Sequence, residues 1–190
     1  SIANMIARRG GRSALVRDEK SLMAADKLIL PGVGSFKNGM DVLVRNGLVD
    51  PLKEFAYQSK RPLLGICLGM QMLTFGSEEG EGLGLGFIEG KAKHFPRNDI
   101  DLKVPHMGWN TITVTKENPL LNISQPQDQR FYFAHSFFVE CYDETDIVSK
   151  SEHGISFVSA LQRENIYGVQ FHPEKSHKYG MALIKQFSEV

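Results

Sequence analysis

The stretch that decides the fold is Leu63-Leu64-Gly65-Ile66-Cys67-Leu68-Gly69-Met70-Gln71. An apolar strand leads into a Gly-X-Cys-X-Gly turn, and a helical segment follows. A nucleophile on such a turn is held in strained backbone geometry, and Gly65 and Gly69 leave no Cβ atoms to crowd it. The start of the helix also favours a thiolate over a thiol. We therefore predict that Cys67 is a nucleophile rather than a small buried hydrophobic side chain.

Outward from this turn, short strand-like segments alternate with helical ones, which is typical of βα units. Helices are expected at residues 1–9 and 177–187, and strands at 13–17, 27–30 and 63–66. Residues from about 86 to 171 are rich in β-branched and aromatic side chains, which favours additional antiparallel strands. The sequence therefore predicts an α/β fold. We expect an open, mostly parallel twisted sheet flanked by helices on both faces, in a single domain at residues 1–190.

Composition narrows the possible partners and surroundings. The 190 residues contain 22 Lys plus Arg and 22 Asp plus Glu, without a long run of like charge. Nucleic acid and anionic membranes are therefore not expected as partners. The apolar stretches are far shorter than the roughly 20 residues that cross a bilayer. Two cysteines, Cys67 and Cys141, are too few for a disulfide framework, so we expect a cytoplasmic protein. No cluster has metal-ligand spacing, and we predict neither metal nor cofactor.

A cysteine nucleophile needs a base, and the best candidate is His172 in the segment Tyr167–Glu174. It follows an apolar strand, and the carboxyl ends of parallel strands share one edge of a sheet, where Cys67 is also expected. Glu174, two residues later, can orient the imidazole, and Pro173 restricts the backbone between them. The residues therefore predict a Cys-His-Glu triad, with His135 as the alternative base. Three further histidines stand in polar segments where a solvated role is expected: His94, His153 and His177.

The loop Leu30–Phe36 offers hydrogen-bond donors for an oxyanion. Its sequence is Leu-Pro-Gly-Val-Gly-Ser-Phe, and it directly follows a predicted strand. The backbone N–H of Val33 or Gly34 is expected to pair with that of Leu68, the residue after the nucleophile. The competing interpretation is an ordinary βα turn. A phosphate loop is disfavoured, since no Gly-Lys-Ser/Thr follows the glycines.

Three segments together resemble the class I (triad) glutamine amidotransferases: Pro31–Gly34, Gly65–Gln71 and Gln170–Ser176. Their order and spacing match, and the resemblance covers nearly the whole chain. Within that class the chain is similar to the glutaminase subunits of imidazole glycerol phosphate synthases, because it also carries Val104–Asn110 and Tyr132–Phe137.

The resemblance implies an activity and a partner. Cys67 would attack the side-chain amide of L-glutamine, His172 would protonate the leaving ammonia, and water would then cleave the γ-glutamyl thioester. Glu174 would orient His172. The ammonia would pass to a (β/α)₈-barrel cyclase subunit, the partner in a heterodimer that forms imidazole glycerol phosphate in histidine biosynthesis.

The resemblance also implies roles for residues outside the triad. Gly34 and Gln71 would contact the substrate, assisted by the backbone of Ser136 and Phe137. The residues implied at the cyclase interface are Met107, Trp109, Asn110, Tyr132, Lys175 and Ser176. From the residues alone, Trp109 and Tyr132 fit a core position as well as an interface, and Lys175 and Ser176 fit the opening of the last helix.

One departure from the family pattern and two alternatives remain. The family normally begins with a strand and an Asp-Tyr-Gly-X-Gly-Asn type loop facing the partner, and we expect that this sequence lacks that first strand and loop. The first alternative is a paralogous amidotransferase that serves another acceptor, such as a surface-sugar amidation enzyme. The second is a stand-alone cysteine hydrolase, against which Gln71 and the Trp109 segment argue.

Overall fold

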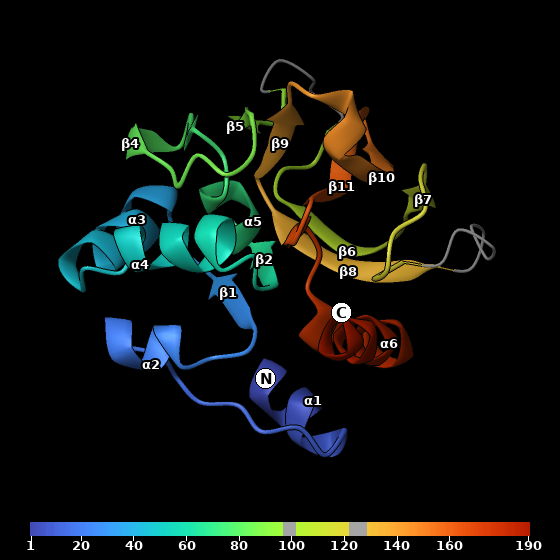
Figure 1. Cartoon of the computed structure of the whole chain (residues 1–190). Coiled ribbons are helices and arrows are strands. Elements are labelled where there is room, and N and C mark those ends of the chain that lie inside the picture. Colours follow the sequence, from blue (N-terminus) through green and yellow to red (C-terminus); the bar gives the residue numbers. More distant parts are fainter. Residues whose placement is uncertain (97–101, 122–128) are drawn as a thin grey trace.

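A computed structural model describes residues 1–96, 102–121 and 129–190 of the chain (Figure 1). Its first half contains α1 (Ile2–Arg8), α2 (Glu19–Met23), β1 (Leu28–Gly32), α3 (Phe36–Arg45), α4 (Val49–Lys53), the π-helix η1 (Glu54–Gln58), β2 (Leu63–Cys67), α5 (Leu68–Met72), β3 (Gly76–Ser77), β4 (Gly80–Leu83) and β5 (Gly90–His94). Its second half contains β6 (His106–Thr111), β7 (Thr113–Val114), β8 (Arg130–His135), β9 (Phe137–Cys141), η2 (Glu144–Asp146), β10 (Ile147–His153), β11 (Ile155–Arg163), β12 (Ile166–Val169), η3 (Pro173–Lys175) and α6 (His177–Glu189).

The strand that carries the cysteine turn lies inside the main sheet. β2 pairs in parallel with β1 on one side and with β12 on the other. All five residues of β2 are buried, as expected of an apolar strand with neighbours on both edges and both faces. Beyond β12 the sheet continues through β11, β9, β5, β3 and β4, while β6 and β8 form a separate two-stranded sheet.

The expected α/β fold class is confirmed, including the antiparallel strands of the second half. The parallel part is narrower than expected, since among the described residues it comprises the pairs β1–β2, β2–β12 and β3–β5. The strand expected at residues 13–17 is wrong. That segment pairs with no other strand in the described chain, and the Leu15 side chain is 76% exposed. Without a hydrogen-bonded neighbour, alternation of side chains alone does not make a strand.

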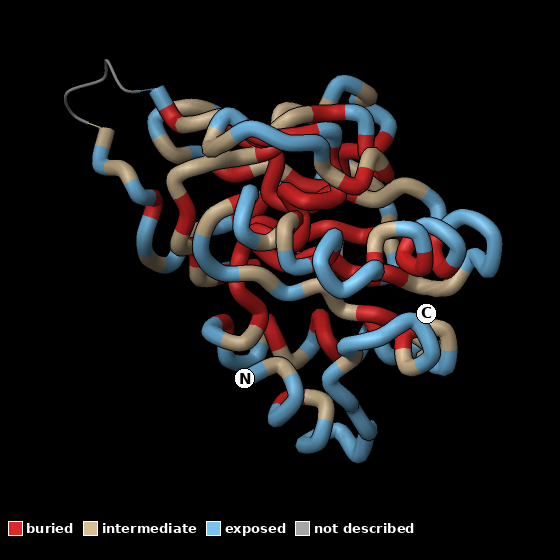
Figure 2. The backbone as a smooth tube through the Cα atoms, turned by 90° about the vertical axis from the view of Figure 1, so that its left-hand side faces the viewer, coloured by how far each residue is buried: buried red, intermediate tan, exposed pale blue. Residues whose placement is uncertain are grey.

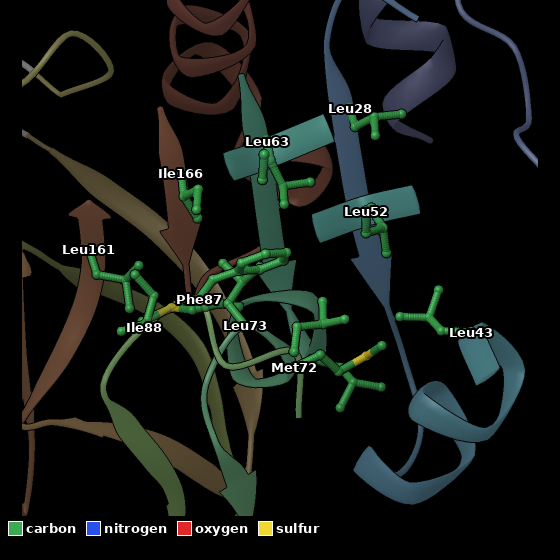
Figure 3. Packing of buried hydrophobic residues seen from close by; sticks show 14 of the residues in the cluster. Leu28, Leu43, Leu52, Leu63, Met72, Leu73, Phe87, Ile88, Leu161 and Ile166 are labelled. Carbon is green, nitrogen blue, oxygen red and sulfur yellow. The ribbon is translucent and has the colours of Figure 1, made fainter. Parts of the chain in front are cut away.

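Two apolar cores cover the two faces of the main sheet. Successive side chains of a strand point to opposite faces, and Leu63 of β2 enters one core while Leu64 enters the other. The first core receives side chains from α2, α3, α4, η1 and α5. Figure 3 shows Leu43 of α3, Leu52 of α4 and Met72 of α5 among them. The second receives side chains from α1 and α6. Figure 2 shows the buried backbone gathered in the interior, where the central strands lie. None of the described helices combines the length and apolar character that a membrane span needs.

Candidate active site

The carboxyl ends of β1, β2 and β12 meet at one edge of the sheet. Gly32 at the end of β1 is in register with Cys67 at the end of β2, and Val169 at the end of β12 is in register with Ile66. The loop that carries Val33 and Gly34 leaves β1 at this edge. The segment from Gln170 to His172 leaves β12 beside it. The structure therefore brings together the three segments that the sequence singled out.

Cys67 lies on a strained turn, as its flanking glycines predicted. Its backbone has φ +53° and ψ −109°, outside the ordinary conformations of a residue with a side chain. The packing around the turn explains the glycines. A Cβ atom on Gly69 would lie 1.8 Å from the carbonyl oxygen of Leu30, and one on Gly65 would lie 2.7 Å from the carbonyl oxygen of Gly69. The turn is thus held against β1 at distances that only glycine permits.

The imidazole of His172 lies between Cys67 and a carboxylate. Its Nδ1 is 2.8 Å from Oε1 of Glu174, so it donates there and leaves Nε2 for the sulfur. Burial disfavours the charged ring, but hydrogen bonds with Cys67 and Glu174 outweigh it and raise the pKa of His172 to about 9. Burial raises the pKa of Glu174, but the hydrogen bond from His172 outweighs this and holds it below its usual value. At neutral pH His172 thus carries a proton that a leaving group can take.

The alternative base, His135, is bonded elsewhere. Its Nδ1 lies 2.8 Å from the carbonyl oxygen of Phe137, and its Nε2 lies 3.0 Å from Nδ1 of His106. Burial lowers the pKa of His135 to about 3. Because both ring nitrogens are already engaged, the geometry favours His172 as the base.

The main chain at His172 is fixed by strand β8 and by Ser176. The N–H of His172 donates to the carbonyl oxygen of Tyr132 at 2.8 Å. The hydroxyl of Ser176 donates to the carbonyl oxygen of His172 at 2.6 Å and accepts from the N–H of Tyr132 at 3.0 Å. Ser176 is 0% exposed, and its hydroxyl makes no cap hydrogen bond to α6. The Ser176 side chain is thus used inside the chain, where it fixes the backbone of His172, and its role at a partner interface stays a prediction.

The expected oxyanion donors flank the nucleophile. Val33 and Gly34 follow β1 directly, and Leu68 is the first residue of α5. Val33 is 86% exposed and Gly34 has φ +95°, a conformation that favours glycine. The far end of this loop is anchored, because the N–H of Phe36 donates to Oε2 of Glu79 at 2.6 Å. A short exposed segment thus lies between two fixed ends.

The expected substrate residues lie beside the turn, with most of their polar atoms in use. Nε2 of Gln71 donates to the carbonyl oxygen of Phe137 at 2.9 Å and to Oε1 of Gln170 at 3.2 Å. This leaves the side-chain oxygen of Gln71 for a ligand. The Phe137 carbonyl also accepts from His135, so both of its lone pairs are occupied. The Ser136 carbonyl accepts from a backbone N–H as well.

Gln170 is a site residue that the sequence reasoning missed. Its side chain is fully buried, and its Nε2 lies 3.7 Å from Sγ of Cys67. A signal was available. In extended backbone, residues two apart lie on the same side of the chain, so Gln170 faces the same way as His172.

Four of the residues expected at a partner interface, Met107, Trp109, Tyr132 and Lys175, form one group with His177 that is exposed or half-buried. This group is here called the Trp109 surface. Met107 is 64% exposed and Trp109 is 42% exposed on β6. Trp109 is in register with Tyr132 of β8, and their ring centroids are 6.3 Å apart. Nζ of Lys175 lies 5.4 Å from the Tyr132 ring. His177, expected to be solvated, is exposed and also stacks on Trp109, with the ring centroids 5.6 Å apart.

Asn110 differs from its neighbours in the Trp109 segment. Its Nδ2 donates to the carbonyl oxygen of Glu152 at 2.8 Å and lies 3.2 Å from Nε2 of His106. Its Oδ1 accepts from the N–H of Thr111. Because all of these contacts are internal, Asn110 acts as a structural link beneath the Trp109 surface.

Comparison with known proteins decides the family. The sequence profile described as "Glutamine amidotransferase class-I" matches residues 1–189. The chain belongs to this family. The resemblance read from the sequence motifs is thus confirmed, and with it the enzyme class.

Curated relatives within the family share nearly the whole chain. A protein of Methanococcus maripaludis named imidazole glycerol phosphate synthase subunit HisH 2 is 49% identical over 187 residues, which cover 98% of this chain and 92% of the relative. The subunit HisH of Leptospira borgpetersenii is 43% identical over 192 residues, covering 100% of this chain and 94% of the relative.

Solved structures agree on the fold. A crystal structure of a glutamine amidotransferase matches 98% of this amidotransferase chain and 89% of its own, with a TM-score of 0.75 at 18% identity. A glutamine amidotransferase from Thermotoga maritima matches 98% and 75%, with a TM-score of 0.63 at 17% identity. At these identities the likeness concerns the fold alone.

Proposed function

We propose that this class I glutamine amidotransferase is the glutaminase subunit of an imidazole glycerol phosphate synthase. It hydrolyses L-glutamine to glutamate and ammonia and supplies the ammonia for histidine biosynthesis in the cytoplasm. The names of relatives that are 43% and 49% identical over nearly their full length support this assignment. They favour it over a paralogous amidotransferase with another acceptor and over a stand-alone hydrolase. The observation that carries the chemistry is the contact of Cys67 with His172, whose other nitrogen is held by Glu174.

In the first half-reaction, His172 holds the proton of the Cys67 thiol, and Sγ attacks the carbonyl carbon of the glutamine side-chain amide as a thiolate. The C–S bond forms, and the carbonyl oxygen becomes an oxyanion. The N–H of Leu68 and that of Val33 or Gly34 stabilise this oxyanion, in a loop that Gly34 allows to turn its amides inward. When the intermediate collapses, the C–N bond breaks and His172 gives its Nε2 proton to the leaving nitrogen. Ammonia departs and a γ-glutamyl thioester remains.

In the second half-reaction, His172 acts as a base. Now neutral, it removes a proton from water, and the resulting hydroxide attacks the thioester carbonyl. The C–S bond breaks, glutamate leaves, and the sulfur and His172 return to their starting states. Glu174 keeps the ring in one tautomer throughout and stabilises its charged form. The raised pKa of His172, about 9, suits the first step, in which the ring must be protonated.

The substrate is held by residues around the turn. Gly34 and Gln71 contact glutamine, with help from the backbone of Ser136 and Phe137. Because both hydrogens of the Gln71 amide are used internally, its oxygen is the atom that accepts a hydrogen bond from the substrate. The carbonyl oxygen of Phe137 already accepts two internal hydrogen bonds, so it has no lone pair left for the substrate.

The partner is a (β/α)₈-barrel cyclase subunit that docks on the Trp109 surface in a heterodimer. Exposed Met107 and Trp109 provide apolar area, and Lys175 provides a charge at its edge. This surface is joined to the catalytic base, since the carbonyl of Tyr132 accepts the backbone N–H of His172. Docking there would bring the acceptor close to the ammonia source.

A bypass experiment tests the proposal. In the complex with the cyclase, Cys67→Ala is expected to lose synthesis from glutamine and to retain synthesis from an added ammonium salt. Cys141→Ala is the matched control, because this thiol lies outside the site, and it is expected to retain both activities. Survival of glutamine-dependent synthesis in Cys67→Ala would refute the nucleophile. Loss of both activities would refute a separable ammonia donor. Failure of any cyclase to copurify with the chain would refute the partner.

A further inference from the structure

Gln170 lies closer to the nucleophile than its place in the sequence suggested. Its fully buried side chain directs one end of its amide at Sγ of Cys67, 3.7 Å away. Which end faces the sulfur matters, because an N–H stabilises a thiolate whereas a carbonyl oxygen repels it. On another side the sulfur lies 4.0 Å from the carbonyl oxygen of Ala134, a contact that suits the thiol form. A donor at Gln170 therefore opposes the effect of Ala134.

The carbonyl of Phe137 decides the orientation of this amide. A carbonyl oxygen can only accept, so the Gln71 atom 2.9 Å from it must be Nε2. The same nitrogen lies 3.2 Å from Gln170, and the Gln170 atom at that contact must therefore be the acceptor Oε1. The other end of the Gln170 amide, its NH₂ group, is consequently the end that faces Cys67.

Besides the hydrogen bonds of Gln71 and Gln170, a second series of hydrogen bonds ends at the Phe137 carbonyl. It occupies the second lone pair of that oxygen. Nδ1 of His135 must donate to the Phe137 oxygen. In a neutral ring Nε2 of His135 then carries a lone pair, which accepts from Nδ1–H of His106. Nε2 of His106 then accepts from Nδ2 of Asn110. This requires both rings to be neutral, and burial provides it by lowering the pKa of His106 to about 4 and that of His135 to about 3. Every donor has an acceptor, and no link can be reversed alone.

We infer that Gln170 is a positioning residue for the nucleophile, which donates a hydrogen bond to the sulfur of Cys67 in an orientation that the Phe137 carbonyl fixes through Gln71. The bond favours the thiolate over the thiol and holds the sulfur towards His172. The inference deepens the proposed function and rests on Cys67 as the nucleophile.

The test measures how fast iodoacetamide alkylates Cys67 as a function of pH, read by mass spectrometry of the Cys67 peptide. Gln170→Leu removes the donor and is expected to move the midpoint of alkylation upward by about one pH unit, a tenfold smaller thiolate fraction below the midpoint. Gln170→Glu keeps an oxygen for Gln71 but turns a second oxygen towards the sulfur. Because this oxygen repels a thiolate, the alkylation midpoint of Gln170→Glu is expected to move further upward than that of Gln170→Leu. In the complex, kcat for glutamine is expected to fall about tenfold in Gln170→Leu, with KM within about twofold.

Ser159→Ala is the matched control. Ser159 is buried beside Gln170, and its carbonyl accepts the Gln170 N–H, but its hydroxyl bonds to Ser149 and does not reach the sulfur. It is expected to leave the midpoint unchanged. A wild-type midpoint in Gln170→Leu, or an equal shift in Ser159→Ala, would overturn the inference. If Gln170→Leu does not fold, Gln170→Glu decides by the same criterion. Failure of the proposed function is seen separately, as glutaminase activity that survives Cys67→Ala.

Discussion

The neutral rings of His106 and His135 make the fold sensitive to acid. Lowering the pH from 7 to 5 is the perturbation. Both rings are buried, and burial lowers their pKa values from 6.5 to about 4 for His106 and about 3 for His135. The positive charge of a protonated His153, whose ring stacks on His106 at 4.2 Å, is the smaller cause of the lowered pKa of His106. The folded chain therefore stays unprotonated at these positions across the whole interval.

The size of the effect follows from proton linkage. Above pH 6.5 neither state binds protons at these rings, so the neutral network is fully stabilising there. Below pH 6.5 the unfolded chain binds a proton at each ring and the folded chain does not, so unfolding becomes easier by about 1.4 kcal/mol per pH unit and ring. Over the interval down to pH 5 this amounts to about 2 kcal/mol for each ring, or about 4 kcal/mol together.

Urea denaturation at pH 7 and pH 5 measures this loss. Other titrating groups, Glu174 among them, contribute equally to all variants and cancel in a comparison. Between pH 7 and pH 5 the free energy of unfolding is expected to fall by about 2 kcal/mol less in His106→Gln, and likewise in His135→Gln, than in the wild type. Ser159→Ala, which removes a buried hydrogen bond without a titrating group, is expected to lower the free energy of unfolding equally at both pH values. An acid loss in both histidine variants as large as that of the wild type would refute the neutral network.

Three further predictions concern the oxyanion loop, the anchoring of His172 by Ser176, and the second cysteine. Gly34→Ala and Gly47→Ala both place a side chain at positive φ with no atom within 4 Å of the new Cβ, so both are expected to cost about 1 kcal/mol in urea denaturation. Only Gly34→Ala is expected to lower glutaminase kcat, by about 10²-fold, because it hinders the turning of an oxyanion amide; equal kcat values in the two variants would contradict an oxyanion role. Ser176→Ala leaves the Tyr132 N–H without its acceptor and is expected to cost about 1–3 kcal/mol in unfolding free energy and to reduce kcat, whereas unchanged values of both would contradict the anchoring role. Burial raises the pKa of Cys141 to about 11, so iodoacetamide at pH 7 is expected to leave this thiol unmodified, and rapid labelling there would contradict the assignment.

The sequence was informative where a local pattern has a single structural meaning. The apolar run before Cys67 and its paired glycines predicted a buried strand and a strained turn, because few other structures accommodate that combination. The segment before His172 was readable for the same reason. The strand expected at residues 13–17 was not, since a strand exists only with a neighbour, and the segment itself does not say whether one is present.

The contacts between distant segments were the part that could not be predicted. Gln170 and Gln71 are far apart along the chain, and only the packing of α5 against β12 brings their amides together. Ser176 looked like an interface residue or a helix cap, and the hydrogen bond that its hydroxyl accepts from the Tyr132 N–H depends on how η3 meets β8. Polar residues in a loop carry no periodic signal that distinguishes a surface position from a buried link.

The atom on which both series of hydrogen bonds converge belongs to the main chain. A side-chain substitution at Phe137 cannot delete its peptide carbonyl. The carbonyl therefore continues to orient Gln71, and through it the Gln170 amide, whichever side chain stands at position 137. Evolutionary drift can therefore change the Phe137 ring, which packs on His94 at 4.9 Å, without touching the electrostatics at the sulfur. Only backbone chemistry reaches this atom. Replacing the peptide bond after Phe137 by an ester through semisynthesis would weaken the oxygen as an acceptor and loosen both glutamine amides at once, while every side chain stays as it is.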